Sequence, residues 1–287
     1  MAGKLIAVSG PPGCGKTTLA IKLAQAVHEL TKKKIVFVSP DTMIPAMGLI
    51  FPKRPKESLL SLGTALENVN LSISNILGVI ATTKAMPNLG YLGYIPGEGP
   101  YSYAALQEQK VMDMYEILRE HFDYIFVDCT RDREDLISSI GVGLSDHLIQ
   151  MINPDIKSIA YYGFEPLQDR AIQVLNVQHN DLYMPIQDTK AHFSDIHFTV
   201  MYSRMVKMQM VEGELMDPLK DAVYQKAIAP IVNLLLARIN AEPEEAPETD
   251  VDTDNVDAEA EALATTEETE GQPSETPVET DADAFWS

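Results

Sequence analysis

A phosphate-binding loop is predicted near the start of the chain. The residues from Gly10 to Thr17 read Gly-Pro-Pro-Gly-Cys-Gly-Lys-Thr, which matches the eight-residue P-loop pattern. The pattern stands between an apolar run at Lys4–Ser9 and a segment whose apolar residues have helical spacing. In this strand-turn-helix context, glycines let backbone N–H groups converge on phosphate oxygens. The helix that follows adds the positive end of its dipole.

The side chains of this loop have separate predicted roles. Lys16 is expected to neutralise the β- and γ-phosphates of a nucleoside triphosphate and so to assist its hydrolysis, and the Thr17 hydroxyl is expected to bind Mg²⁺. The residues expected to contact the nucleotide are Gly10, Pro11, Pro12, Gly13, Cys14, Gly15, Lys16, Thr17 and Thr18.

Two aspartates follow apolar runs that predict buried strands. Asp128 ends the run that begins at Tyr124, where a carboxylate holds Mg²⁺ directly or through water; the alternative is an acid that caps the next helix. Asp41 follows the run Ile35–Val38 and is a candidate to orient an attacking water, with a turn beside Pro40 as the alternative. Ligands gather at the carboxyl ends of parallel strands, so both acids are predicted to lie near the P-loop.

The elements that must position these residues alternate between strands and helices. This alternation predicts an α/β fold with a doubly wound, mostly parallel sheet and helices on both faces. The predicted strands are Lys4–Ser9, Ile35–Val38, Leu89–Ile95, Tyr124–Val127, His147–Ile152, Ile172–Leu175 and Ile196–Met201, and the longer predicted helices are Leu59–Leu77, Tyr103–His121 and Pro218–Ile239.

Acidic residues gather at the end of the chain. The formal net charge is -20, but residues 241–287 hold 17 Asp and Glu and no Lys or Arg. The sequence therefore predicts a near-neutral P-loop domain over residues 1–240 and a disordered acidic tail over residues 241–287. Near the end of the tail, Phe285 and Trp286 are either an anchor for a partner pocket or a frayed terminus.

Composition also sets expectations for the cell compartment and for partners. The sequence shows neither a secretion signal nor 18 successive apolar residues, so a cytoplasmic protein is expected. Cys14 and Cys129 are not expected to form a disulfide. Cys14 is expected to be a tolerated small residue of the loop, with a thiol of lowered pKa at the helix N-terminus as the alternative. Direct DNA or membrane binding is not expected, because the domain is near neutral and the tail is acidic.

The motifs over residues 3–237, and the order in which they follow one another, resemble those of the ParA/MinD family of P-loop ATPases. The resemblance is closest to the family's pilus-assembly branch, the CpaE/TadZ-like proteins. Besides the P-loop, the resemblance is carried by Val38-Ser39-Pro40-Asp41, by Asn88-Leu89-Gly90-Tyr91-Leu92-Gly93-Tyr94-Ile95-Pro96-Gly97, by Phe122-Asp123-Tyr124-Ile125-Phe126-Val127-Asp128, by Ser145-Asp146 with Asn153-Pro154-Asp155, and by Val174-Leu175-Asn176.

The resemblance implies an ATPase that binds ATP with Mg²⁺, forms an ATP-dependent homodimer and acts with protein partners. The cargo that it implies is a pilus or secretion apparatus, a plasmid or a conjugation machine. It also implies that Asn176 reads the edge of the adenine, whereas the alternative is a polar residue at a strand end.

Three positions depart from the family pattern. The family's signature lysine is replaced by Pro11, the first acid of its Asp-x-Asp by Ser39, and its switch after Asp128 by Cys129-Thr130-Arg131-Asp132. Arg131 or Arg133 is a candidate for the missing cation, although arginines at a helix start are usually solvated. These departures predict slow or partner-dependent hydrolysis, or else a scaffold that binds ATP without hydrolysing it.

An AAA-type motor and a small-molecule kinase share this type of P-loop and are less favoured. Position 129 is Cys instead of the glutamate that activates water in such motors, and no arginines cluster as in a kinase lid. A further group of side chains is predicted to fill the core, with a partner surface as the alternative: Met201, Met205, Met208 and Met210.

Overall fold

The computed structural model describes most of the first 241 residues. The described ranges are 2–55, 58–130, 135–179, 184–193, 196–219 and 221–241. The predicted acidic tail beyond residue 241, with Phe285 and Trp286, lies outside them, as do Arg131 and Arg133.

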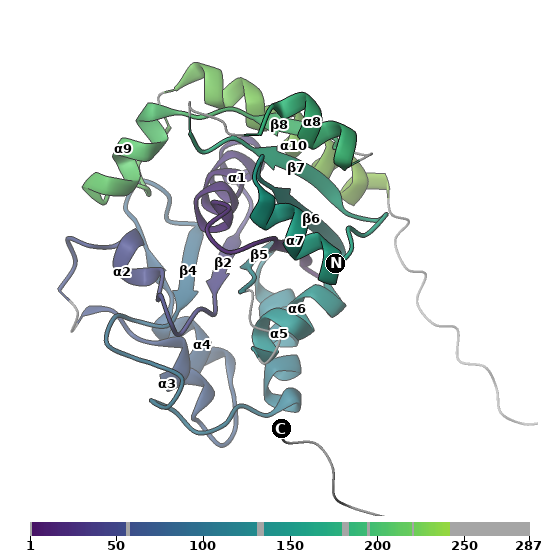
Figure 1. Cartoon of the computed structure of the whole chain (residues 1–287). Coiled ribbons are helices and arrows are strands. Elements are labelled where there is room, and N and C mark those ends of the chain that lie inside the picture. The colour runs from purple at the N-terminus through teal and green to yellow at the C-terminus, as the bar shows by residue number, and fades with distance from the viewer. Residues whose placement is uncertain are drawn as a thin grey trace, which may run out of the picture. The chain divides into compact units, whose positions relative to one another are not determined.

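An eight-stranded sheet lies at the centre of the described domain, in the order β3-β4-β2-β5-β1-β6-β7-β8 (Figure 1). Its neighbouring strands are parallel except the pair β3 and β4, which is antiparallel. The predicted doubly wound α/β fold is therefore confirmed. The strands are β1 Lys4–Ser9, β2 Ile35–Ser39, β3 Ala81–Thr82, β4 Leu89–Gly93, β5 Tyr124–Asp128, β6 His147–Ile152, β7 Ile172–Asn176 and β8 Phe198–Val200.

The central strands are buried on both faces because helices cover the sheet on each side. In β1, Ile6 and Val8 pack in one core cluster, and Leu5 and Ala7 pack in the other. This alternation explains why a run of apolar residues, instead of a polar-apolar alternation, marks the strand in the sequence.

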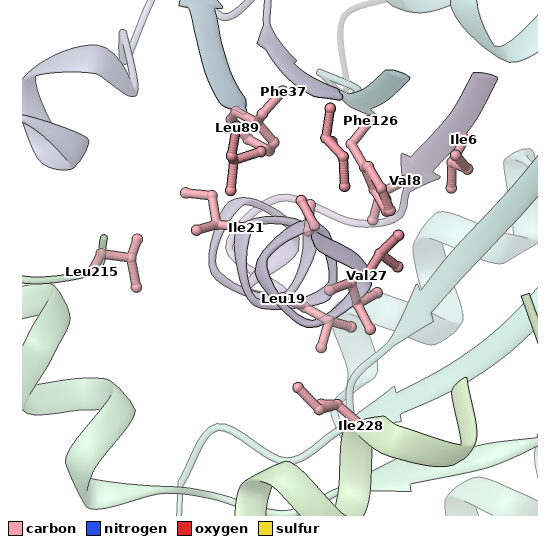
Figure 2. Close-up of a cluster of buried hydrophobic side chains, with 14 of the residues drawn as sticks. Ile6, Val8, Leu19, Ile21, Val27, Phe37, Leu89, Phe126, Leu215 and Ile228 are labelled. Carbon is pink, nitrogen blue, oxygen red and sulfur yellow. The ribbon is translucent and has the colours of Figure 1, made fainter. Parts of the chain in front are cut away.

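Helices contribute to three apolar clusters. The first cluster takes residues from α1 Lys16–Thr31, α2 Met47–Ile50, α9 Arg204–Glu212 and α10 Ala222–Ala241. The second takes residues from α3 Leu62–Leu66, α4 Ile73–Val79, α5 Glu108–His121 and α6 Leu136–Leu144. The third, smaller cluster joins α7 Ile156–Phe164 and α8 Ile186–His192 to β6 and β7. Figure 2 shows α1 end-on, with sheet residues such as Phe37 and Phe126 on one side and Ile228 on another.

Several boundaries differ from the sequence predictions for local reasons. The predicted helix Leu59–Leu77 is two helices, because Ser72 and Asn75 form a capping box that starts α4. The predicted helix Tyr103–His121 begins only at Glu108, after Gln107 in an extended conformation. The two-residue edge strand β3 was not predicted, since it is too short to show a pattern.

Among the described helices, α10 is long and apolar enough to span a membrane by length and composition. Its inward side chains, which include Ile228, Ile231 and Leu235, are buried in the first core cluster. Burial of that face accounts for part of its apolar composition, since 28% of its most apolar stretch is buried.

Candidate functional site

The P-loop joins β1 to α1 and is shaped by three glycines with positive φ, Gly10, Gly13 and Gly15. A Cβ at Gly10, with φ of +148°, would lie 2.7 Å from the Met151 carbonyl oxygen. Gly15 has φ of +86° and begins α1 without a side-chain cap. Since no side chain caps them, the first N–H groups of α1 can be satisfied by an anion.

Lys16 folds back over this loop. Its Nζ atom donates hydrogen bonds to the carbonyl oxygens of Gly10 and Pro11, both at 3.0 Å. Both acceptors are neutral, so these bonds leave the positive charge of Lys16 for an anionic ligand. Lys16 thus lies where the sequence predicts a cation for a phosphate chain.

The structure brings the two predicted metal ligands together. Because β5 lies beside β1 with Asp128 opposite Val8, Asp128 reaches the start of α1. The Thr17 hydroxyl donates a hydrogen bond of 2.6 Å to Oδ2 of Asp128. The alternative role as a helix cap is wrong, since Asp135 is the residue that caps α6.

The carboxylate of Asp128 suits a divalent cation. Its Oδ1 atom is buried and has no hydrogen-bond partner among the described residues. Burial raises the pKa of Asp128 to about 6, although the Thr17 hydrogen bond and the Lys16 charge act in the opposite direction. A hydroxyl beside a buried carboxylate is the oxygen donor set that Mg²⁺ prefers beside phosphates. Thr17 and Asp128 therefore fit the predicted metal: these two residues would hold it, and it would supply positive charge beside the phosphates.

Asp41 forms a turn beside Pro40, which is the alternative to a role in orienting water. Its Oδ1 atom accepts hydrogen bonds of 2.8 Å from the backbone N–H groups of Met43 and Ile44. The same residue lines the cavity that contains the P-loop. Its charge also adds to the raised pKa of Asp128, after the larger effect of burial. A role of Asp41 toward water stays a prediction.

Two amide side chains hold the P-loop from the end of β7. Asn176 Nδ2 donates to the Cys14 carbonyl at 2.8 Å, and Gln178 Nε2 donates to the Gly13 carbonyl at 2.7 Å. Both also line the cavity, so the adenine contact predicted for Asn176 stays a prediction. The contact of Gln178 was missed, although its position two residues after Asn176 in extended chain was a usable signal.

Ser39, which the sequence analysis names only as a departure from the family pattern, also lies at the site. It stands where the family pattern has an acid, and its buried hydroxyl oxygen has no hydrogen-bond partner among the described residues. Ser39 lines the same cavity as Asp41 and Asp128. A polar atom buried at the cavity wall without a protein partner is one that a ligand or water can satisfy.

Both cysteines are free and buried, so no disulfide joins them. The alternative of a lowered pKa at Cys14 is wrong. Burial raises the pKa of this thiol to about 11, because the loss of hydration outweighs the charge of Lys16 and the hydrogen bond to its backbone. Burial also raises the pKa of Cys129.

The thiols are therefore expected to react slowly with iodoacetamide in the folded protein. At pH 8, Cys14 is far below its pKa of about 11, so the neutral thiol predominates and the reactive thiolate is scarce. Mass spectrometry should find both cysteines mostly unmodified after a pulse that fully labels the protein in urea. Rapid labelling of native Cys14 at pH 8 would contradict the raised pKa.

A cavity of about 1400 Å³ runs past the P-loop in two directions. One end lies at the carboxyl ends of β2 and β5, with Asp41 and Asp128. The other end lies at the carboxyl ends of β7 and β8, with Asn176 and Met201. Such a cavity admits an elongated ligand whose phosphates lie on the P-loop.

The methionines that follow β8 line this cavity or its surroundings instead of filling the core. The prediction of core filling is wrong, since Met201, Met205, Met208 and Met210 are each between 39% and 49% exposed. Met201 and Met210 line the cavity.

The parallel sheet and the P-loop that follows its central strand β1 define the fold of the P-loop nucleoside-triphosphate-binding proteins. Within that class, the chain has the fold of the MinD and ParA ATPases. It is similar to the septum site-determining protein MinD of Pyrococcus horikoshii OT3 complexed with Mg-ADP, with a TM-score of 0.63 and 16% identity over 84% of this chain and 100% of that chain.

Two further solved structures show the same likeness. The ParA family ATPase of Chlorobium tepidum TLS has a TM-score of 0.62 and 13% identity over 81% of this chain and 99% of that chain. The MinC:MinD cell division protein complex of Aquifex aeolicus has a TM-score of 0.62 and 17% identity over 85% of this chain and 99% of that chain. At these identities the likeness shows the fold, as predicted; the pilus-assembly branch stays a prediction. No protein-family model and no curated protein sequence matches the chain.

Proposed function

We propose that this protein is a nucleotide-switched ATPase of the ParA/MinD type, which binds ATP with Mg²⁺ and positions or assembles a cellular cargo. Hydrolysis is slow or depends on a partner. The cargo is a pilus or secretion apparatus, a plasmid or a conjugation machine, and the protein acts in the cytoplasm.

The observation that carries the proposal is the pairing of Thr17 with Asp128 beside the P-loop. Their oxygen atoms lie 2.6 Å apart, and the second carboxylate oxygen of Asp128 is buried without a described partner. Lys16 lies on the same loop, and its hydrogen bonds with the described residues go to neutral carbonyl oxygens. A cation, a hydroxyl and a carboxylate in this arrangement suit a triphosphate with a divalent metal better than they suit a simple anion.

The position of the nucleoside follows from this arrangement. The metal ligands mark the γ-phosphate end of the triphosphate, toward β5 and β2. The nucleoside then extends the other way, toward the ends of β7 and β8, where Asn176 meets the cavity. An amide that can both donate and accept hydrogen bonds supports the choice of adenine, and the MinD structure with Mg-ADP supports an adenine nucleotide.

The absence of a lysine at Pro11 supports slow turnover. A P-loop lysine that reaches the phosphates of a partner subunit is part of the pattern that this chain resembles, and proline cannot supply a positive charge. Cys129 and Thr130, in place of the usual switch, also remove the expected γ-phosphate contact. The chain keeps the groups for binding, and at Pro11 and Cys129–Thr130 it departs from the groups that the family pattern uses in hydrolysis.

ATP with Mg²⁺ is expected to increase the dimer fraction relative to ADP. The γ-phosphate is the group by which the two nucleotides differ, and it would lie against the loops of Asp41 and Thr130, so it can change their order. Sedimentation velocity with a slowly hydrolysed ATP analogue and with ADP measures the change, and Lys16→Ala is the control. The same sedimentation in both nucleotides, without a partner, would argue against the switch.

The second candidate function is a scaffold that holds ATP as a structural ligand. Pro11 favours it, and so does the use of Asp41 in a turn. Phosphate release over hours separates the two: the ATPase releases phosphate at a rate that a partner increases, and the scaffold releases none with or without partner.

A further inference from the structure

A lysine is buried in the helix that carries the P-loop. Lys22 of α1 is 1% exposed, and its Nζ atom donates hydrogen bonds to the carbonyl oxygens of Leu215 at 2.8 Å and Asp217 at 3.2 Å. A third bond, of 3.1 Å, goes to Oε1 of Gln25. Burial lowers the pKa of Lys22 to about 8, so the ammonium is costly to keep inside the protein. Its three bonds offset that cost.

Gln25, one helical turn further along α1, strengthens the same contact. Its Nε2 atom donates to the carbonyl oxygens of Met216 at 3.0 Å and Leu215 at 3.4 Å. Three successive carbonyls of the segment 215–217 are therefore held by two side chains of α1. Leu215 faces α1 in Figure 2 and is buried in the first core cluster, so apolar packing and directed hydrogen bonds act together. We call this contact the α1 latch.

The latch holds one end of α9, which has little packing of its own. Val206 is the buried residue of α9, and Met205, Lys207, Met208 and Val211 are exposed. At the other end, the hydroxyl of the N-cap Ser203 donates a 2.5 Å hydrogen bond to Asp221. Figure 1 shows α9 at the margin of the domain. A helix with so small a buried face is positioned mainly by what holds its ends.

This weakly packed helix is also a wall of the cavity. Val206, Lys207 and Met210 of α9 line the cavity together with Leu215. The Thr18 hydroxyl, in the first turn of α1, donates to Sδ of Met210 at 3.9 Å. The wall therefore faces the P-loop. Its first residue, Arg204, follows the end of β8, on the side where the nucleoside is placed above, and its far end lies against Pro52 and Lys53.

We propose that Lys22 is a positioning residue for nucleotide binding, because it fixes the wall formed by α9 and Leu215 to the helix that carries the P-loop. Lys22 is outside the cavity lining and acts through that wall. The inference rests on the proposed function for the identity of the ligand. The wall supports the nucleoside, whereas the phosphates are bound by the P-loop itself.

The test compares the binding of a nucleotide with the binding of a phosphate chain that has no nucleoside. Lys22→Met keeps the apolar stem and removes the ammonium, so it should weaken MgATP binding about tenfold through the loss of its two hydrogen bonds to the carbonyls of Leu215 and Asp217. Inorganic tripolyphosphate with Mg²⁺, which does not reach the wall, should bind within about twofold of the wild type. Hydrogen exchange of residues 204–217 should accelerate while exchange of β1 and α5 is unchanged. Lys34→Met, which removes the same charge from an exposed lysine, is the matched control.

Each result of this experiment supports or overturns the role of Lys22. Equal weakening of MgATP and tripolyphosphate would show that Lys22 only supports the P-loop helix, and unchanged MgATP binding would show that the wall does not need it; either result overturns the inference. If the wild type binds neither ligand, the proposed function fails, and with it the nucleotide role of Lys22, while exchange of residues 204–217 still tests the latch. If Lys22→Met does not fold, Gln25→Met removes the other half of the latch and should give the same selective loss.

Discussion

Lys16→Ala is expected to weaken MgATP binding by about 100-fold or more, since a charge-assisted contact with the triphosphate contributes about 3 kcal/mol. The Lys16 ammonium is bonded to the carbonyls of Gly10 and Pro11 and lies over the loop on which the phosphates are placed. Alanine removes the positive charge that the P-loop side chains bring to the ligand. Isothermal titration calorimetry measures the loss directly.

The same substitution should leave the ligand-free fold nearly unchanged. Lys16 is half-buried and its bonds go to two carbonyls of its own loop, so its loss breaks no contact between distant elements. Thermal unfolding without nucleotide should shift by only a few degrees, which corresponds to about 1 kcal/mol or less. Lys157→Ala, at an exposed position on α7, controls for the loss of one charge. An unchanged ATP dissociation constant in Lys16→Ala would refute the assignment of the site.

The P-loop and Asp128 could be predicted because local pattern and sheet geometry suffice for them. Four apolar residues, three of them buried, lead into Asp128, and parallel strands end at one edge of the sheet. Once β5 pairs with β1, the meeting of Asp128 with Thr17 follows. The fold class was predictable for the same reason, since continuous apolar runs identify strands that are covered on both faces.

The α1 latch could not be predicted from the sequence. Lys22 lies in α1 at a position that the pattern assigns to neither core nor site, and its partners are backbone carbonyls some 190 residues away along the chain. Any residue type can offer such a carbonyl, so the partner leaves no mark in the sequence. The methionines show the opposite difficulty, because an apolar side chain fits a core and a cavity wall equally well.

The buried carboxylate leads to the second large effect: Asp128→Asn is expected to remove the Mg²⁺-dependent part of ATP binding. Asparagine retains an oxygen that accepts from the Thr17 hydroxyl, so the local hydrogen bond survives. It lacks the negative charge, and a divalent metal gains most of its protein affinity from charged oxygen ligands. In the wild type, Mg²⁺ should tighten ATP binding by about tenfold or more; in the variant, dissociation constants with Mg²⁺ and with EDTA should agree within about twofold.

Asp135 provides the control for a general charge effect at this site. It is a second carboxylate in the lining of the same cavity, and burial also raises its pKa. Its Oδ2 atom, however, accepts hydrogen bonds from the Ser138 and Thr130 hydroxyls, and its Oδ1 atom accepts from the Ile137 N–H as it caps α6. Asp135→Asn keeps the capping oxygen and removes the same charge, so it should preserve the difference between Mg²⁺ and EDTA. If both variants lost that difference equally, the negative charge of the cavity as a whole, and not a metal ligand at Asp128, would be responsible.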